Sequence, residues 1–163
     1  MNYQTLLSKA YREARNSHDR STHIGALIVN PSNGSVLAGA SNQFPTKQLQ
    51  LDEANHERPR KYLMTEHAER GVIYKCAREG IQTAGKIMVA NAACCADCAR
   101  AIALAGIVLV VTHEECMQRF NNAWQESIAV GCKILESYGV AYWRWSGKIN
   151  SVENLCNGEV WKP

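Results

Sequence analysis

The stretch NAACCADCARAIALAGIVLVV, residues 91–111, decides the fold of this chain. Its central part, CADCARAIALAG, predicts a helix that ends at Gly106, and the apolar run IVLVV after it is typical of a strand buried on both faces. The segment KIMVAN in front of it predicts another strand. A strand, a helix and a second strand in this order indicate a crossover unit, in which helices pack on a sheet.

The remaining apolar patterns extend this unit in both directions. They predict helices at residues 3–16, 65–79 and 120–138, and strands at HIGALIVN (23–30), SVLAGAS (35–41) and VAYWRW (140–145). The segment PSNG between the first two strands is a hairpin signal, and Trp124 falls on the apolar period of the last helix, which predicts a core position. Residues 42–64 lack periodicity and are expected to form a long loop, while residues 146–163 show no pattern that places them. The sequence therefore predicts one α/β domain over residues 1–163, with a hairpin at one edge of a sheet that is covered on both faces.

The composition limits the classes of function. Hydrophobic residues make up 46% and charged residues 20% of the 163, with a net charge of +3, which is ordinary for a globular protein. No run reaches the roughly 18 apolar residues that a membrane span needs, so no membrane partner is expected. The first helix carries Arg and Glu within its apolar pattern, unlike a signal peptide, and the seven cysteines are an odd count. We therefore expect a cytoplasmic protein with reduced thiols.

The pair Cys95 and Cys98 allows three interpretations on its spacing alone. A C-x-x-C at a helix start can be a redox pair, half of a zinc site, or ordinary packing in a cysteine-rich chain. A second motif, His67-Ala68-Glu69, also opens a helix, and the strand KIMVAN separates the two helices. Consecutive helices on one face of a crossover sheet start at the carboxyl edge of the strands, so His67, Cys95 and Cys98 are expected to meet there.

The three side chains form a ligand set that suits zinc. One imidazole and two thiolates leave a fourth tetrahedral position for water, which is typical of a catalytic rather than a structural metal. Glu69 would then lie beside the metal without being a ligand, where it can shuttle protons. H-x-E together with C-x-x-C is the signature of the zinc deaminases. Cys94 stands where that signature has Pro and could compete with Cys95, but Cys95 and Cys98 share a helix face, so we expect Cys94 to be a packing thiol.

On these motifs the chain resembles the deoxycytidylate (dCMP) deaminases of the cytidine deaminase superfamily. The resemblance extends from about residue 5 to residue 145 and includes ARNSHDRSTHIGALIV, GASNQFP, HAERGVIYKCAREGI, CADCARAIALAGI and WQESIAVGCKILESYGV. It implies a three-layer α/β/α sandwich with a mixed five-stranded sheet, in which the strands outside the edge hairpin are parallel. It also implies a homo-oligomer, hexameric in many members, that dCTP and dTTP regulate.

The resemblance implies roles for individual residues as well. Zinc would be bound by His67, Cys95 and Cys98, and Glu69 would shuttle protons. The substrate contacts that it implies are Asn42 at the sugar, Ser17 and Arg20 near the 5′-phosphate, and Ala68. The chain departs from the family pattern at three positions, which have Gly, Asn and Pro in the family and are here Gln43, Gly71 and Cys94.

The function that the resemblance implies is hydrolysis of dCMP to dUMP and ammonia, which supplies thymidylate precursors. Hydroxide generated by zinc would attack C4 of cytosine, while Glu69 protonates N3 and then the leaving amine. Two alternatives stay open: the same chemistry on a purine or a riboflavin precursor, and a non-catalytic zinc-stabilised module that senses nucleotides. A polynucleotide partner is not expected, because the sequence has no basic stripe with interleaved aromatic residues.

Overall fold

A mixed five-stranded sheet runs through the centre of the computed structural model, which describes residues 1–120, 122–149 and 152–163. The strands follow the order β2 (Val36–Ser41), β1 (Gly25–Val29), β3 (Ile87–Ala90), β4 (Leu109–His113) and β5 (Ala141–Trp145). β1 is antiparallel to both β2 and β3, whereas β3, β4 and β5 are parallel to one another. This topology confirms the predicted edge hairpin and the predicted parallel strands.

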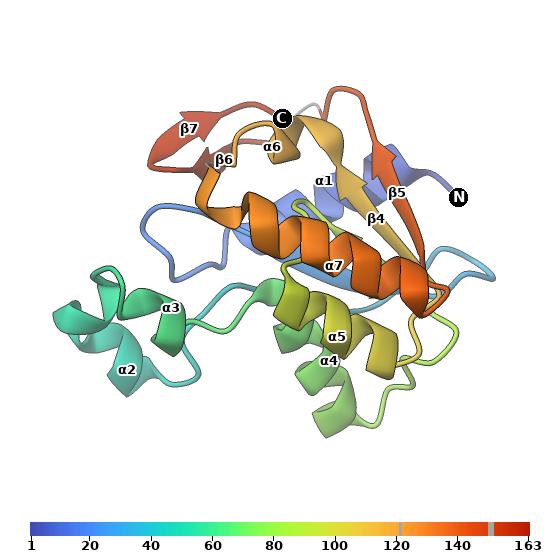
Figure 1. The fold of residues 1–163 in the computed structure, drawn as a ribbon, viewed down its shortest axis with the longest axis horizontal. Coiled ribbons are helices and arrows are strands. Elements are labelled where there is room, and N and C mark those ends of the chain that lie inside the picture. The colour runs from blue at the N-terminus through green and yellow to red at the C-terminus, as the bar shows by residue number, and fades with distance from the viewer. Residues whose placement is uncertain (121, 150–151) are drawn as a thin grey trace.

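Helices cover both faces of the sheet and complete an α/β/α sandwich (Figure 1). The helices of one face are α4 (Ala68–Glu79), α5 (Ala96–Leu104) and α7 (Gln125–Ser137). The opposite face is covered by α1 (Tyr3–Ala14), α6 (Glu114–Met117) and the C-terminal segment. A hydrophobic core lies on each face of the sheet, and alternate residues of a strand pack into opposite cores. Ile28 packs on the α4 side and Val29 on the α1 side, and both are completely buried.

The helices end where the sequence places a glycine. Gly80 follows α4 with φ 69°, and Gly106 follows α5 with φ 72°. Both lie in the left-handed region, which glycine adopts without the steric penalty of a Cβ atom. The predicted helix ends at these two residues are therefore confirmed. Within the described part of the chain, no helix has the length and apolar character needed to cross a membrane.

The segment between β2 and α4 differs from the predicted long loop. It contains three short helices, α2 (Lys47–Leu51), η1 (Glu53–His56) and α3 (Lys61–Met64), which project beside the sandwich (Figure 1). This segment has no apolar period in its sequence, but polar side chains cap its helices. At the start of α2, Thr46 Oγ1 accepts a hydrogen bond from the Leu49 amide at 3.3 Å. The prediction of a structureless loop is wrong here, because local polar contacts form helices that no hydrophobic repeat announces.

Two other regions correct the sequence analysis. The tail forms a hairpin of β6 (Asn154–Cys156) and β7 (Glu159–Trp161), whose buried Cys156 and Trp161 pack on the α1 side of the sheet. Residues 150 and 151 of that tail lie outside the described residues. The helix predicted at 120–138 begins only at Gln125 as α7, and a separate short helix, η2 (Asn122–Trp124), precedes it; residue 121 also lies outside the described residues.

Candidate active site

The structure brings His67, Cys95 and Cys98 together at the starts of two neighbouring helices. His67 is the N-cap residue of α4, Cys95 is the N-cap residue of α5, and Cys98 lies in the first turn of α5. The Nδ1 atom of His67 is 3.5 Å from Cys95 Sγ and 3.4 Å from Cys98 Sγ. A tetrahedral zinc with ordinary bond lengths separates a nitrogen and a sulfur ligand by about 3.6 Å. The donor set and its spacing therefore fit a zinc ion.

The electrostatics of the two thiols also suit metal binding. Hydrogen bonds donated to the Cys95 thiolate by the Cys98 thiol and by the His67 ring lower the pKa of Cys95 to about 4, against the opposing effect of burial. The bond from the Cys98 thiol raises the pKa of Cys98. A thiolate is the form that binds metals, so this site stabilises one of the two required charges on its own.

Cys94 and Glu69 lie next to this cluster in different surroundings. Cys94 is 3% exposed and packs in the core beneath α5, and burial raises its pKa well above the ordinary value. It is not a member of the three-residue ligand group. Glu69 is also 3% exposed, and burial raises the pKa of its carboxyl group. Ala68, between the two motif residues, is completely buried.

Helix α7 holds the start of α5 in place. Cys95 makes no capping hydrogen bond with its own side chain, and Ser127 Oγ of α7 accepts the hydrogen bond from the Ala96 amide at 3.1 Å. Four residues further along α7, Gly131 lies so close that a Cβ atom there would be 2.6 Å from the carbonyl oxygen of Cys94. Helix α7 thus supplies the cap that a ligand cysteine cannot provide, and Gly131 allows the close approach.

A pocket opens in front of His67 and Cys95. The Trp124 ring lies 5.6 Å from the His67 ring and 5.7 Å from the Tyr62 ring, both in edge contacts, and both aromatic residues line the pocket. Trp124 is half-buried and also packs against the hydrophobic core on the α4 side, so the predicted core position is confirmed in part. Its contribution to the pocket wall was not predicted from its place on the helical period.

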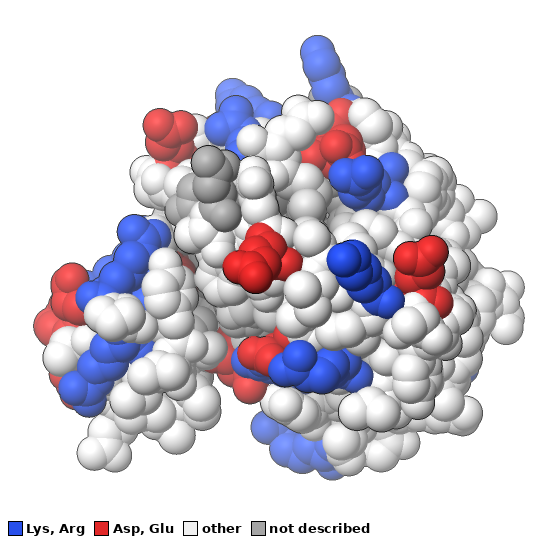
Figure 2. Space-filling model, viewed as in Figure 1, with Lys and Arg blue, Asp and Glu red and all other residues white. Residues whose placement is uncertain are grey.

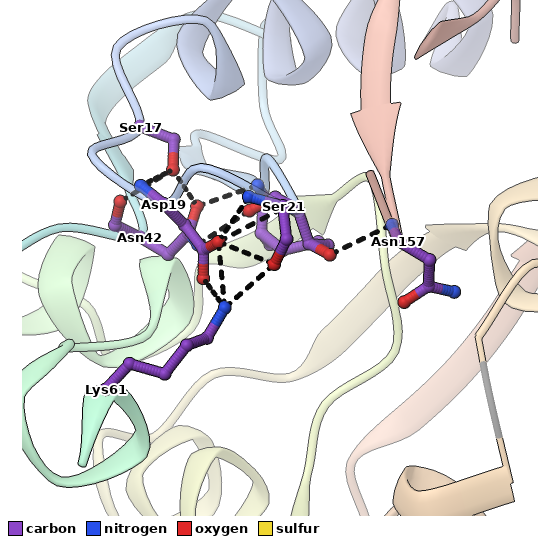
Figure 3. A network of polar contacts seen from close by, with 8 residues as sticks. Ser17, Asp19, Ser21, Asn42, Lys61 and Asn157 are labelled. Atoms are coloured by element: carbon purple, nitrogen blue, oxygen red, sulfur yellow. Dashed lines mark hydrogen bonds and ion pairs between the residues drawn. The ribbon is translucent and has the colours of Figure 1, made fainter. Parts of the chain in front are cut away.

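The side chains that were predicted to contact the substrate do not all lie at the pocket. Asn42 lines the pocket. The Ser17 hydroxyl lies 2.7 Å from Asn42 Oδ1, which puts Ser17 behind Asn42 rather than on the pocket wall (Figure 3). Arg20 pairs with Glu53 through contacts of 2.7 and 2.9 Å and lines a neighbouring hollow instead. The structure thus brings one of these three side chains to the pocket.

A buried ion pair that sequence reasoning missed borders the same pocket. Lys61 Nζ lies 2.8 Å from Asp19 Oδ2 and 2.8 Å from the Ser21 hydroxyl, and the two charged side chains are 11% and 9% exposed (Figure 3). Burial alone would raise the pKa of Asp19, but the hydrogen bonds from Lys61 and Ser21 outweigh it and hold the pKa below the ordinary value. The pair joins α3 to the segment that follows α1. A second missed cation, Arg58, lines the pocket nearby.

Comparison with known proteins gives one family and several similar folds. The family model described as the cytidine and deoxycytidylate deaminase zinc-binding region matches residues 1–114. The dCMP deaminase of cyanophage S-TIM5, solved in complex with dCMP and dUMP, has 22% identity and a TM-score of 0.65, covering 88% of this chain and 94% of that chain. No curated protein matches the sequence.

Two further solved structures share the fold. The diaminohydroxyphosphoribosylaminopyrimidine deaminase and 5-amino-6-(5-phosphoribosylamino)uracil reductase of Thermotoga maritima has 17% identity and a TM-score of 0.61, covering 87% of this chain and 36% of that chain. The protein NE0047, solved as a mutant with 8-azaguanine, has 13% identity and a TM-score of 0.58, covering 91% of this chain and 79% of that chain. At these identities the similarity concerns the fold.

Proposed function

Because the chain belongs to the cytidine and deoxycytidylate deaminase family, we propose that it is a zinc-dependent hydrolase that converts dCMP into dUMP and ammonia. The observation that carries this proposal is the cluster of His67, Cys95 and Cys98 at the pocket, with Glu69 buried beside it. A purely structural zinc is normally closed by a fourth Cys or His. Among the described residues, this group contains three ligands and no fourth.

The mechanism follows from the environment of Glu69. His67, Cys95 and Cys98 would hold the zinc ion, which supplies hydroxide near neutral pH through its Lewis acidity. Burial raises the pKa of Glu69, which favours the protonated form that can donate to N3 of cytosine. The oxygen of water forms the new bond to C4 while Glu69 passes the first proton of that water to N3. Glu69 then takes the second proton from the oxygen and passes it to the exocyclic nitrogen as the bond from C4 to that nitrogen breaks. The products are the uracil nucleotide and ammonia.

Two features of the pocket support a cytosine nucleotide as the substrate. Trp124 and Tyr62 put aromatic surface next to His67, where a flat base can pack. Arg58 lines both the pocket and the adjoining hollow, and its guanidinium has no ion-pair partner within residues 1–120, 122–149 and 152–163. A free guanidinium suits a phosphate group, which favours a nucleotide over a nucleoside.

The competing substrates are other free bases and nucleotides. A diaminohydroxyphosphoribosylaminopyrimidine deaminase and a protein solved with 8-azaguanine are among the similar folds, so a substrate of each type belongs in the same assay. On the face drawn in Figure 2, Lys and Arg are interspersed with Asp and Glu and form no continuous stripe. This pattern offers no support for a polynucleotide substrate.

The test measures bound zinc and ammonia release with protein purified without chelator. Ammonia release is compared for dCMP, CMP, dCTP, deoxycytidine, guanine and diaminohydroxyphosphoribosylaminopyrimidine. We expect about one zinc per chain and a strong preference for dCMP. Zinc-loaded protein that deaminates guanine but none of the cytosine compounds would refute the substrate assignment. It would leave the metal site standing.

The role of Glu69 is tested separately with Glu69→Gln, which keeps the shape of the side chain and removes its acid–base function. We expect bound zinc to stay at the wild-type level and kcat to fall by about 100-fold or more. Near wild-type turnover by this variant would refute the mechanism. A non-catalytic nucleotide sensor, the alternative from another class, would show dCMP binding without ammonia release in either protein.

Assembly and regulation are proposed on the family resemblance alone. We propose a homo-oligomer whose activity responds to dCTP and dTTP. Light scattering after size-exclusion chromatography gives the mass of the assembly, and titration of either triphosphate into the dCMP assay gives the response. A monomer whose rate neither triphosphate changes would overturn both parts.

A further inference from the structure

The turn of the C-terminal hairpin reaches the pocket from outside the matched family region, residues 1–114. Asn157 and Gly158 form this turn between β6 and β7, and Asn157 lines the pocket. The Asn157 amide donates to Thr22 Oγ1 at 3.2 Å, and the Gly158 amide donates to the Ser21 carbonyl at 2.8 Å. Figure 3 shows Asn157 facing the Ser21 segment from the side opposite Lys61. The hairpin turn is thus a fixed part of the pocket wall.

The acceptor oxygens of the other amide and carboxylate side chains of the pocket wall are already bound by donors of the chain itself. Asn42 Oδ1 accepts the Ile24 amide at 2.8 Å and lies 2.7 Å from the Ser17 hydroxyl. Asp19 Oδ1 and Oδ2 are both bound by Lys61, and Oδ1 also accepts two backbone amides and a hydroxyl. Each carbonyl-type oxygen has room for about two good hydrogen bonds, so Asn42 can offer a ligand only an N–H group.

Asn157 is different because its oxygen is free. Its Nδ2 donates to the carbonyl oxygen of Arg119 at 2.6 Å. A carbonyl oxygen only accepts, so this contact fixes the amide with its nitrogen toward Arg119 and its oxygen on the other side. Arg119 is itself held over the Trp161 ring at 4.4 Å. In the part of the chain that the structure describes, Asn157 Oδ1 has no hydrogen-bond donor.

We propose that Asn157 Oδ1 accepts a hydrogen bond from the 3′-hydroxyl of the bound deoxynucleotide; this inference rests on the proposed function. The chemistry of dCMP selects the partner. Its phosphate at neutral pH and its base carbonyl only accept hydrogen bonds. Its exocyclic amine must lie at the reacting carbon near Glu69. The 3′-hydroxyl is the remaining donor, and Asn157 Oδ1 is the amide oxygen of the pocket wall that no donor of the described residues occupies.

The perturbation is Asn157→Gly, which removes the side chain and keeps the backbone. Asn157 has φ 53°, a left-handed conformation that glycine adopts freely and that alanine would strain. The assay compares dCMP with 2′,3′-dideoxycytidine 5′-monophosphate, which lacks the 3′-hydroxyl. For dCMP we expect kcat/KM to fall about threefold to tenfold, mainly through KM, as for loss of one ordinary hydrogen bond. For the dideoxy substrate we expect the variant and the wild type to be equal.

Controls separate this contact from a general change of the hairpin. Val160→Ala alters an exposed residue of β7, 69% exposed, and should leave both substrates unaffected. If Asn157→Gly acts only by removing the contact with Arg119, kcat/KM should fall equally for the two substrates, and this result would overturn the proposal.

If Asn157→Gly does not fold, the comparison of the two substrates with the wild-type protein still tests the proposal. The wild type should prefer dCMP over the dideoxy substrate about threefold to tenfold, and equal rates would overturn the contact. Wild-type protein that binds zinc but does not deaminate dCMP refutes the proposed function as well; activity without a substrate difference refutes only the role of Asn157.

Discussion

Substitution of two helical glycines near the metal ligands tests whether α7 fixes the metal-binding turn, which is the Cys94–Cys95 backbone at the start of α5. Gly131 of α7 faces the Cys94–Cys95 backbone, and Gly71 of α4 follows His67 by one helical turn. In both helices alanine has the higher intrinsic propensity, by about 1 kcal/mol. Propensity alone would therefore make Gly131→Ala and Gly71→Ala equally stabilising, and any difference between them reports their surroundings.

The surroundings predict opposite results. A Cβ at position 71 would meet the Ala40 side chain at 3.6 Å, an ordinary contact, so Gly71→Ala should stabilise the protein by up to about 1 kcal/mol. A Cβ at Gly131 would meet the Cys94 oxygen at 2.6 Å, and the two backbones must separate by about 0.8 Å to restore an ordinary 3.4 Å contact. Overpacking of this kind costs about 1–3 kcal/mol, which exceeds the gain in propensity. Gly131→Ala should therefore be destabilising.

The effect on zinc binding should be larger than the effect on folding. Metal–ligand distances tolerate only about 0.2 Å, whereas the required shift of the Cys94–Cys95 backbone is several times that value. We expect the zinc affinity of Gly131→Ala to fall about 10-fold to 100-fold, the range seen when groups supporting a metal ligand are altered. Competition with a colorimetric chelator measures the affinity, and thermal unfolding measures stability. We expect Gly71→Ala to raise Tm by about 2–4 °C. Wild-type zinc affinity in Gly131→Ala would contradict the conclusion that α7 positions the turn.

Two further predictions concern the buried ion pair. Lys61→Met should reduce the free energy of unfolding by about 3–5 kcal/mol in urea titrations, because it leaves the Asp19 charge buried without its partner, while the zinc content of the folded protein stays near wild type. The pKa of Asp19 is held below 3.8, so its stabilisation is present above this pH and is lost as the pH falls through the lower folded value. The difference in unfolding free energy between wild type and Asp19→Asn should therefore shrink between about pH 6 and about pH 3; a constant difference would contradict this assignment.

The metal half of the site could be predicted from the sequence because its signals are local. His67 and Glu69 lie at one helix start, Cys95 and Cys98 at the next, and one strand separates the two helices. Connection rules then bring the two helix starts to the same sheet edge. The structure agrees with this prediction, because His67 Nδ1 lies 3.5 Å from Cys95 Sγ and 3.4 Å from Cys98 Sγ.

The pocket wall around Asp19 and Asn157 could not be predicted in the same way, because its contacts join residues that are far apart in the sequence. Lys61 is buried although lysine is normally exposed, and only its contact with Asp19, 42 positions away, explains this. One signal was available and overlooked. Asn157-Gly158 between two short apolar runs is the same hairpin indication as Asn33-Gly34 in the segment PSNG, which correctly predicted the first hairpin.

These contacts give the two halves of the site separate mechanical supports. Helix α7 holds the metal-binding turn through Ser127 and Gly131. The segment at Asp19–Thr22, by contrast, is held from one side by Lys61 of α3 and from the other by the hairpin turn at Asn157. Changes at either support of this segment should therefore appear in KM, while changes along α7 should appear in zinc affinity. Since Lys61 and Asn157 act on the same short segment, their effects on substrate binding should also be non-additive, as expected for residues that share a structural partner.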